Sequence, residues 1–248
     1  MTLRSLESLF EAVAEGSLSP AEASLKARSA RLEFAHLDLD RPRRTGEPEV
    51  VFGSHKSAEQ IVPLLEQIAA TGQPALATRI SPDKARAICA ALPAAEHHPT
   101  ARAVVVRPAA TVEPVGHIAV VCAGTSDLPV ADEAAITAEL FGSKVVRHTD
   151  IGVAGLHRML SRLDTLREAR VLVVVAGMEG ALPTVLAGLV RAPVVAVPTS
   201  VGYGAHLHGV TPMLGMLTAC APGISVVNID NGFGAAVVAH RINRLGAP

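Results

Sequence analysis

Apolar runs and helical stretches alternate regularly in the second half of the chain. From residue 117 onward, five apolar runs have the sequences HIAVVCAG, KVVRH, RVLVVVAG, APVVAVP and ISVVNID. Helical stretches follow them at about residues 130–141, 153–163, 180–190, 209–220 and 232–244. Val-rich strands that alternate with helices are typical of a parallel sheet that is covered on both faces. The pattern therefore predicts a three-layer α/β domain with a doubly wound parallel sheet over residues 101–248.

The first hundred residues have a less regular pattern. Apolar side chains from Leu3 to Val13 recur at helical spacing, and Ser19 and Pro20 suit the start of a second helix. Further helices are expected at residues 57–70 and 81–92, short strands at residues 49–52, 74–80 and 101–108, and a linker at residues 93–99. We therefore expect a smaller N-terminal α+β region over residues 1–100.

Glycine and small polar residues follow each of the five predicted strands. These segments are AGTSD, HTDIG, AGMEG, PTSVGYG and NIDNGFG. Ligands of doubly wound folds bind where the carboxyl ends of the strands meet, so we expect these loops to bind a phosphorylated small molecule. Gly124 allows backbone N–H groups to approach an anion, and the hydroxyls of Thr125 and Ser126 can donate to a phosphate. The alternative is a capped turn without a ligand, because Ser126 and Asp127 are also good N-cap residues.

Three further positions are candidates for chemistry, and each also has a structural interpretation. Glu179 is either a ligand-facing carboxylate or an acid that stabilises a helix N-terminus. The pair His157 and Arg158 suits contact with an anionic substrate, although a helical histidine is more often a surface residue. Cys220 ends a helical stretch, and its sequence surroundings alone favour a buried core thiol.

Composition and charge exclude several classes of protein. The 248 residues are 49% hydrophobic and 18% charged, which is typical of a globular chain. The formal net charge of −1 gives no general attraction for nucleic acid, and the longest apolar run, at about residues 171–177, is too short to span a bilayer. Acidic residues near the start argue against a signal peptide, and three widely separated cysteines favour a reducing cytoplasm. The sequence has neither a GxGxxG fingerprint nor a CxxC or HExxH zinc motif.

Taken together, these motifs resemble the LarB family, the pyridinium-3,5-biscarboxylic acid mononucleotide synthases of nickel-pincer cofactor biosynthesis. The resemblance rests on residues 124–127, 150–153, 155–158, 176–183, 197–204, 227–234 and Cys220. In the N-terminal region, the matching residues are Asp38, Arg41, Arg44, Thr45, Gly46, Pro48, Glu49 and Lys56. The C-terminal half is also similar to the purine-pathway aminoimidazole ribonucleotide carboxylases and mutases, which lack this N-terminal run. The chain departs from the family pattern at Leu39, Asp40, Phe52, Ala154, Thr218 and Ala219.

The resemblance implies an enzyme, a carboxylase and hydrolase, that acts on nicotinic acid adenine dinucleotide. The implied reactions are carboxylation of the pyridinium ring at carbon 5 with CO2 and hydrolysis of the phosphoanhydride with release of AMP. Magnesium is expected for the phosphate step. A cytoplasmic homo-oligomer is also implied, since related carboxylases assemble into octamers, and neither nucleic acid nor a membrane is an expected partner.

The implied chemistry changes the interpretation of Cys220. A pyridinium is an electrophile and cannot attack carbon dioxide, but a nucleophile added to ring carbon 4 turns carbon 5 into an enamine carbon, which can. A thiolate adds strongly and leaves again, so we expect Cys220 to be the nucleophile. Loss of the carbon 5 proton needs a base, for which Glu179 is the first candidate and His157 the second.

The remaining matched side chains are expected to bind the substrate or a metal ion. The phosphates and ribose would be held by Gly124, Thr125, Ser126, Asp127, Asp150, Arg158 and Gly177. The ring would be surrounded by Ser200, Tyr203, Asn228 and Asp230. The nicotinate carboxylate or the second nucleotide half would be reached by Arg41, Arg44, Glu49 and Lys56. Asp127 or Asp150 would reach magnesium through water.

Three other functions stay open on the sequence. The first is a purine-type carboxylase or mutase that acts on an aminoimidazole ribonucleotide, which needs no thiol. The second is a nucleotide-binding module without catalysis. The third is a structural oligomerisation protein, in which the small residues of the helices at 209–220 and 232–244 pack between subunits.

Overall fold

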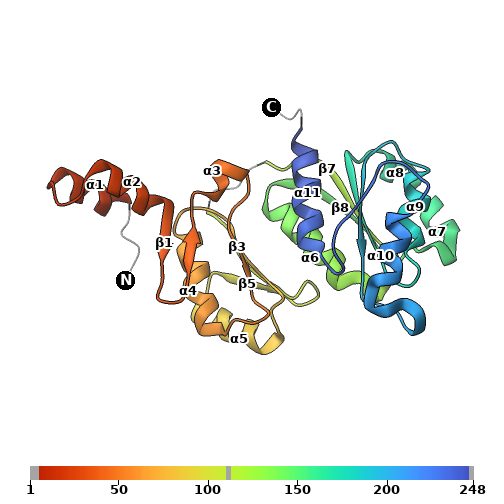
Figure 1. Cartoon of the computed structure of the whole chain (residues 1–248), viewed down its shortest axis with the longest axis horizontal. Helices are drawn as coiled ribbons and strands as arrows, with labels where there is room; N and C mark the ends of the chain where they lie inside the picture. Colours follow the sequence, from red (N-terminus) through yellow and green to blue (C-terminus); the bar gives the residue numbers. More distant parts are fainter. Residues whose placement is uncertain (1–5, 110–112, 246–248) are drawn as a thin grey trace. The chain divides into compact units, whose positions relative to one another are not determined.

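Residues 6–109 and 113–245 are described by the computed structural model, in which the chain forms two units. The N-terminal unit comprises residues 1–98 and 103–111, and the C-terminal unit comprises residues 99–102 and 112–248. Figure 1 colours the chain from the N-terminal helices in red to the last helix in blue.

The N-terminal unit contains a helical pair, a short antiparallel strand pair and a mixed four-stranded sheet. Its elements are α1 (Leu6–Ala14), α2 (Pro20–Arg28), β1 (Ser29–Arg31), β2 (His36–Asp38), α3 (Arg41–Thr45), β3 (Val50–Phe52), α4 (Ala58–Ala69), β4 (Ala75–Thr78), α5 (Pro82–Ala91), β5 (Ala95–His98) and β6 (Ala103–Val106). The start of α2 is confirmed by a capping box between Ser19 and Glu22. The sheet has the order β3-β4-β6-β5, and fully buried Ile61, Leu65 and Ile88 of α4 and α5 belong to its core.

Two expectations for this region differ from the structure. The linker predicted at residues 93–99 is wrong, because residues 95–98 form strand β5, which pairs antiparallel with β6. An edge strand carries polar residues such as His97 and His98 without an apolar pattern, so periodicity does not detect it. Strand β6 also pairs with β4, which places residues 103–106 in the N-terminal unit rather than beyond the expected boundary at residue 100.

The C-terminal unit confirms the predicted doubly wound α/β fold. Its elements are β7 (Val115–Cys122), η1 (Thr125–Asp127), α6 (Leu128–Leu140), β8 (Ser143–His148), η2 (Val153–Gly155), α7 (Leu156–Leu160), α8 (Leu163–Arg167), β9 (Val171–Ala176), α9 (Ala181–Ala187), β10 (Val194–Pro198), η3 (Gly204–Gly209), α10 (Val210–Leu217), β11 (Ile224–Val226) and α11 (Gly232–Arg244). The five strands are parallel and have the order β11-β10-β9-β7-β8. The chain therefore reverses its direction of winding between β7 and β9, which is where folds of this type bind ligands.

Alternate residues of the strands point into two separate cores. On one face, Val120 and Val173 pack against α6 and α11, and on the other, Val121 and Val174 pack against α7 to α10. Figure 1 shows these two groups of helices on opposite faces of the sheet. The first core relies on alanines of α6 and α11, such as Ala134 and Ala235, which lets the helices approach closely without aromatic side chains. None of the described helices is long and apolar enough to cross a membrane.

Two helical stretches are shorter than the sequence pattern suggests. The stretch expected at residues 153–163 is divided among η2, α7 and the start of α8. The stretch expected to end at Cys220 ends as α10 at Leu217, with Thr218 as its C-cap. Cys220 therefore lies in the loop that leads to β11.

A polar cluster around the buried side chain of Asn243 connects α11 to the amino ends of β7 and β8 by hydrogen bonds. Asn243 on α11 accepts a hydrogen bond from the backbone N–H of His117 over 3.0 Å, and its amide donates to the carbonyl of Val115 over 2.8 Å. The same amide donates to the hydroxyl of Ser143 at the start of β8 over 3.1 Å. These bonds stabilise an irregular stretch of β7 in which Gly116 has a φ of +64°.

Candidate active site

Loops that follow four of the five parallel strands surround a cavity of about 510 Å³ in the C-terminal unit. These loops follow β7, β8, β9 and β10, and β7 and β9 flank the point at which the strand order reverses. The lining residues are Ala123, Gly124, Ser126, Asp127, Asp150, Gly152, Val153, Ala154, Arg158, Ala176, Gly177, Met178, Glu179, Ala181, Leu182, Val201, Gly202 and Tyr203. The cavity thus lies where the fold predicts a ligand.

A buried carboxyl group forms part of the cavity wall. Asp127 accepts a hydrogen bond from the backbone N–H of Gly124 over 3.0 Å and another from the Thr199 hydroxyl over 2.8 Å. Asp127 is only 4% exposed, and this burial raises the pKa of its carboxyl, although the hydrogen bonds oppose the shift. The side chain thus binds the backbone at the start of the turn after β7 and connects that turn to the end of β10, whereas it makes no side-chain hydrogen bond as the N-cap of α6.

Arg158 is the one cationic side chain among the described residues that line the cavity. Its guanidinium donates a hydrogen bond to Asp150, and the side chains of the pair are 39% and 49% exposed. An exposed ion pair contributes only about 0–1 kcal/mol to stability. A phosphate can therefore replace Asp150 as the partner of Arg158 with little loss of free energy. The cavity also has the carboxylates of Asp127 and Glu179, so its lining has more acidic than basic groups.

Non-glycine residues with left-handed backbone conformations follow three of the strands. Asp150 after β8, Met178 after β9 and Asp230 after β11 have φ values of 56°, 48° and 56°. This conformation costs of order 1 kcal/mol for each residue and persists only where the surrounding structure enforces it. Two of these residues, Asp150 and Met178, line the cavity.

Glycines of the site have two different roles. A Cβ atom on Gly177 would lie 2.2 Å from the carbonyl oxygen of Val201 and 2.7 Å from the Thr199 hydroxyl oxygen, so a side chain is excluded by packing. A Cβ atom on Gly124 would meet only a carboxylate oxygen of Asp127, at 3.8 Å. Gly177 is therefore needed for the contact between two loops, whereas Gly124 leaves space for a ligand beside the backbone.

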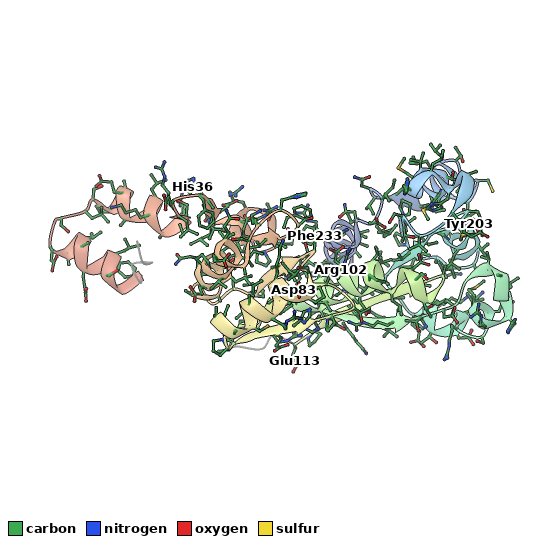
Figure 2. The ribbon with its side chains drawn as sticks, turned by 90° about the horizontal axis from the view of Figure 1, so that it is seen from below. His36, Asp83, Arg102, Glu113, Tyr203 and Phe233 are labelled. Atoms are coloured by element: carbon green, nitrogen blue, oxygen red, sulfur yellow. The ribbon has the colours of Figure 1, made fainter. Side chains whose placement is uncertain are left out.

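The loop after β10 combines an exposed tyrosine with a buried histidine. Tyr203, labelled in Figure 2, is 80% exposed and borders the cavity. His206 is buried against Gly202, and its Nδ1 accepts a hydrogen bond from the backbone N–H of Gly209 over 3.2 Å. A neutral His206 therefore carries its proton on Nε2, which has no hydrogen-bond partner among the described residues. His206 therefore packs against the backbone of this loop and does not line the cavity.

The structure brings together eight of the fourteen site residues expected in the C-terminal unit. Those that line the cavity are Gly124, Ser126, Asp127, Asp150, Arg158, Gly177, Glu179 and Tyr203. Those that do not line it are Thr125, His157, Ser200, Cys220, Asn228 and Asp230. Asp230 instead accepts a hydrogen bond from the backbone N–H of Ser200 over 2.8 Å and so connects the loops after β10 and β11. His157 is exposed on α7, which leaves Glu179 as the better placed of the two candidate bases.

Cys220 is exposed, so the interpretation as a buried core thiol is wrong for this residue. Its loop enters β11 at the amino edge of the sheet, because the backbone N–H of Val194, the first residue of β10, donates to the carbonyl of Gly223. Cys122, by contrast, is fully buried, and this burial raises the pKa of its thiol to about 11. Cys89 lies on α5 of the N-terminal unit and is partly buried.

The charged residues expected to reach the substrate from the N-terminal unit have partners within that unit. Arg41 pairs with Glu49 over 3.1 Å, and Arg44 pairs with Asp38. The Lys56 ammonium donates to the carbonyl of Phe52 over 2.9 Å. Their contact with substrate stays a prediction.

A magnesium ion held by protein side chains alone does not fit this site. The described residues contain no group of three His, Cys, Asp or Glu side chains arranged to hold a metal ion. Asp127 already accepts two hydrogen bonds, and Asp150 is paired with Arg158. Magnesium is commonly bound by one or two carboxylates together with substrate phosphates, so the expected ion would depend on the substrate.

Three positions of the site lie in the loops expected to bind a ligand, although the sequence pattern does not single them out individually. Thr199 binds Asp127, Gly152 approaches the Ala123 carbonyl closely, and Met178 lines the cavity in a strained conformation. Each follows a predicted strand within a few residues, which is the one signal that would have found them.

Comparison with known proteins agrees with this geometry. Residues 117–248 match the AIR carboxylase family, and residues 29–108 match the LarB/PurE-like N-terminal domain. The chain is 41% identical over 221 residues to an uncharacterized protein of Methanocaldococcus jannaschii, covering 86% of this chain and 85% of that protein. It is 32% identical over 130 residues to the N5-carboxyaminoimidazole ribonucleotide mutase of the same organism, covering 50% of this chain and 77% of that enzyme.

The chain therefore belongs to the AIR carboxylase family, a class of carboxylase- and mutase-type enzymes. Within this class, the additional N-terminal domain makes it a LarB-like protein.

Proposed function

We propose that this protein carboxylates the pyridinium ring of nicotinic acid adenine dinucleotide at carbon 5 and hydrolyses its phosphoanhydride. The products are pyridinium-3,5-biscarboxylic acid mononucleotide and AMP. The observation that carries the proposal is the combination of an AIR-carboxylase-type cavity with a LarB/PurE-like N-terminal domain in one chain.

The charges of the cavity support a cationic substrate with a phosphate group. Arg158 and the space beside Gly124 suit the phosphate, since guanidinium and backbone N–H groups are the usual donors to such anions. Asp127 and Glu179 lie in the same lining and favour a positively charged ring over a neutral one. An aminoimidazole ring has no permanent positive charge, so these carboxylates favour the pyridinium.

In the proposed chemistry, the Cys220 thiolate adds to ring carbon 4 and forms a carbon–sulfur bond. The ring becomes a neutral dihydropyridine, and the electron pair now available at carbon 5 attacks carbon dioxide and forms the new carbon–carbon bond. A base then removes the proton from carbon 5, for which Glu179 is the candidate within the cavity. Expulsion of the thiolate from carbon 4 restores the aromatic pyridinium.

Hydrolysis of the phosphoanhydride is a separate step, in which water attacks phosphorus and AMP leaves. Magnesium enters the proposal only as an ion that the substrate phosphates bring with them, and the carboxylation steps do not depend on it. Removal of divalent cations with a chelator is therefore expected to slow AMP release without preventing formation of a carbon–carbon bond.

The decisive experiment is incubation of Cys220→Ser with nicotinic acid adenine dinucleotide and bicarbonate, followed by product mass. The variant is expected to form no carboxylated product, whereas the matched variant Cys89→Ser, altered in the other unit, keeps the wild-type rate. Full activity of Cys220→Ser would exclude the covalent mechanism.

A second candidate function is carboxylation or rearrangement of an aminoimidazole ribonucleotide. The 32% identity to a mutase of that pathway favours it. This function needs no thiol and assigns no role to residues 29–108. Parallel incubation of the wild-type protein with each substrate distinguishes the two functions. The proposed reaction turns the dinucleotide into AMP and a carboxylated mononucleotide, whereas the second function converts only an aminoimidazole ribonucleotide, into its carboxylated or rearranged product.

A further inference from the structure

Gly155 and the guanidinium of Arg158 are in close contact at the start of α7. Gly155 is the N-cap of this helix, and Arg158 is its third residue. Side chains of a helix point towards its amino end, so a long side chain lies over the residue three or four positions earlier. Beyond the chain neighbours of Gly155, the three atoms nearest to an added Cβ are Nε, Nη2 and Cζ of Arg158, at 2.5, 2.9 and 3.1 Å. A side chain at position 155 and the guanidinium in this position therefore exclude each other.

The backbone conformation at Gly155 does not require glycine. Its φ of −120° and ψ of 62° lie outside the left-handed region, so other residues can adopt them. The obstacle to a side chain is also different from that at Gly177, where a Cβ atom would meet the backbone carbonyl of Val201. The guanidinium of Arg158 is the end of a flexible side chain and can turn away. A side chain at position 155 would therefore move the guanidinium without preventing the turn from forming.

The segment of residues 150–155 is held firmly against the end of β7. The backbone N–H of Ile151 donates to the carbonyl of Cys122 over 3.2 Å. The backbone N–H of Gly152 donates to the carbonyl of Ala123 over 2.9 Å. The backbone on which the guanidinium lies is thus fixed relative to the loop after β7, which forms part of the cavity wall.

We propose that Gly155 is a positioning residue, which holds the guanidinium of Arg158 in the place from which it binds a phosphate of the substrate. Asp150 makes the second contact and occupies one donor on Nη1, so most of the five N–H donors of the guanidinium are left for a ligand. Arg158 lines the cavity, whereas Gly155 acts only through it. The inference rests on the proposed function, in which Arg158 binds a substrate phosphate.

An arginine that is already in position loses less conformational freedom when it binds a ligand. Replacement of Gly155 by alanine removes this advantage, because the guanidinium must leave its place over the backbone. Ordering one flexible side chain on binding corresponds to a change in Kd of about two- to tenfold. We therefore expect Gly155→Ala to raise the Kd by about this factor while the melting temperature without ligand stays at the wild-type value.

Titration calorimetry with two probes tests the expected loss of affinity. The probes are nicotinic acid adenine dinucleotide without bicarbonate and ADP-ribose, which has two phosphates but no pyridinium. Gly155→Ala should bind both probes more weakly by a similar factor, because the phosphates are common to them. Gly188→Ala is the matched control, since its Cβ atom lies at ordinary contact distances of 3.5 and 3.8 Å, and it should bind like the wild type.

Two further measurements distinguish positioning from a structural role. In an Arg158→Ala background, Gly155→Ala should have no additional effect on the Kd, because the side chain through which it acts is absent. In carboxylation assays, Gly155→Ala should raise KM and leave kcat near the wild-type value, since the phosphate is held in the ground state and in the transition state alike. A structural role would instead lower the melting temperature and weaken binding equally in both backgrounds.

The outcomes separate this inference from the proposed function. Wild-type affinity of Gly155→Ala, a lowered melting temperature, or an equal loss of affinity in the Arg158→Ala background overturns the inference and leaves the proposed function in place. A wild-type protein that binds both probes but forms no carboxylated product overturns the proposed function, while the comparison of Gly155→Ala in the two backgrounds still decides the role of Gly155. A wild-type protein that binds neither probe overturns both.

Discussion

Replacement of Gly177 by alanine tests the close contact between the loops that follow β9 and β10. The new Cβ atom would lie 2.2 Å from the carbonyl oxygen of Val201 and 2.7 Å from the hydroxyl oxygen of Thr199. Because a backbone carbonyl cannot turn aside as a flexible side chain does, the two loops must separate. Overpacking of this kind costs about 1–3 kcal/mol. One kcal/mol shifts the melting temperature by about 2–4 °C in a chain of this size, so we expect a decrease of about 2–12 °C.

Thermal unfolding followed by circular dichroism measures this decrease, and two glycine variants provide controls. Gly188→Ala, at the end of α9, places its Cβ atom at ordinary contact distances of 3.5 and 3.8 Å and should melt like the wild type. Gly124→Ala meets only Asp127, at 3.8 Å, so it should also keep the melting temperature while weakening dinucleotide binding. If Gly177→Ala melts at the temperature of Gly188→Ala, the two loops are not in the contact described here.

Three further predictions concern a buried acid, the thiols and the polar cluster of α11. Burial raises the pKa of the Asp127 carboxyl, so the folded wild type loses stability relative to Asp127→Asn as the pH rises above the ordinary aspartate pKa. The melting temperature of Asp127→Asn minus that of the wild type should therefore be larger at about pH 8 than at about pH 4, and a difference that does not change with pH would contradict this. In a Cys89→Ser background, an aromatic disulfide reagent should modify Cys220 in the native protein, whereas Cys122, with a pKa of about 11, should react only after unfolding. Asn243→Ala removes the partners of two partly buried backbone groups and should lower the free energy of unfolding by about 2–4 kcal/mol in urea titrations. The exposed neighbour Arg244→Ala should change it by less than about 0.5 kcal/mol, and similar values for both variants would refute this role of the cluster.

The parallel sheet could be predicted from the sequence because its strands are buried on both faces. Such strands are continuous Val-rich runs, as in β9, and helices separate them along the chain. Strand β5 could not be predicted in this way, since an edge strand of sequence AEHH has no apolar period. The end of α10 before Cys220 was also missed, because MLGMLTAC is composed of residues that are compatible with a helix throughout.

Only those parts of the candidate site that follow from the order and direction of the strands could be predicted from the sequence. Parallel strands bring their carboxyl ends to one edge, so Gly124, Asp150 and Gly177 meet there wherever the helices lie. The partners of each side chain depend on tertiary distances that a sequence does not contain. The bond between Asp127 and Thr199 joins positions 72 residues apart, and the position of Cys220 in a loop depends on where α10 ends.

The hydrogen bonds between Asn243 and the amino end of β7 determine when the C-terminal unit can fold during synthesis. The amino end of this strand is held by a residue that the ribosome adds after every strand of the sheet has been made. The N-terminal sheet is complete at residue 106, so that unit can fold while the rest of the chain is still being translated. The nascent C-terminal unit, by contrast, exposes its Val-rich strands until α11 has emerged, which makes this interval the period of greatest risk for aggregation.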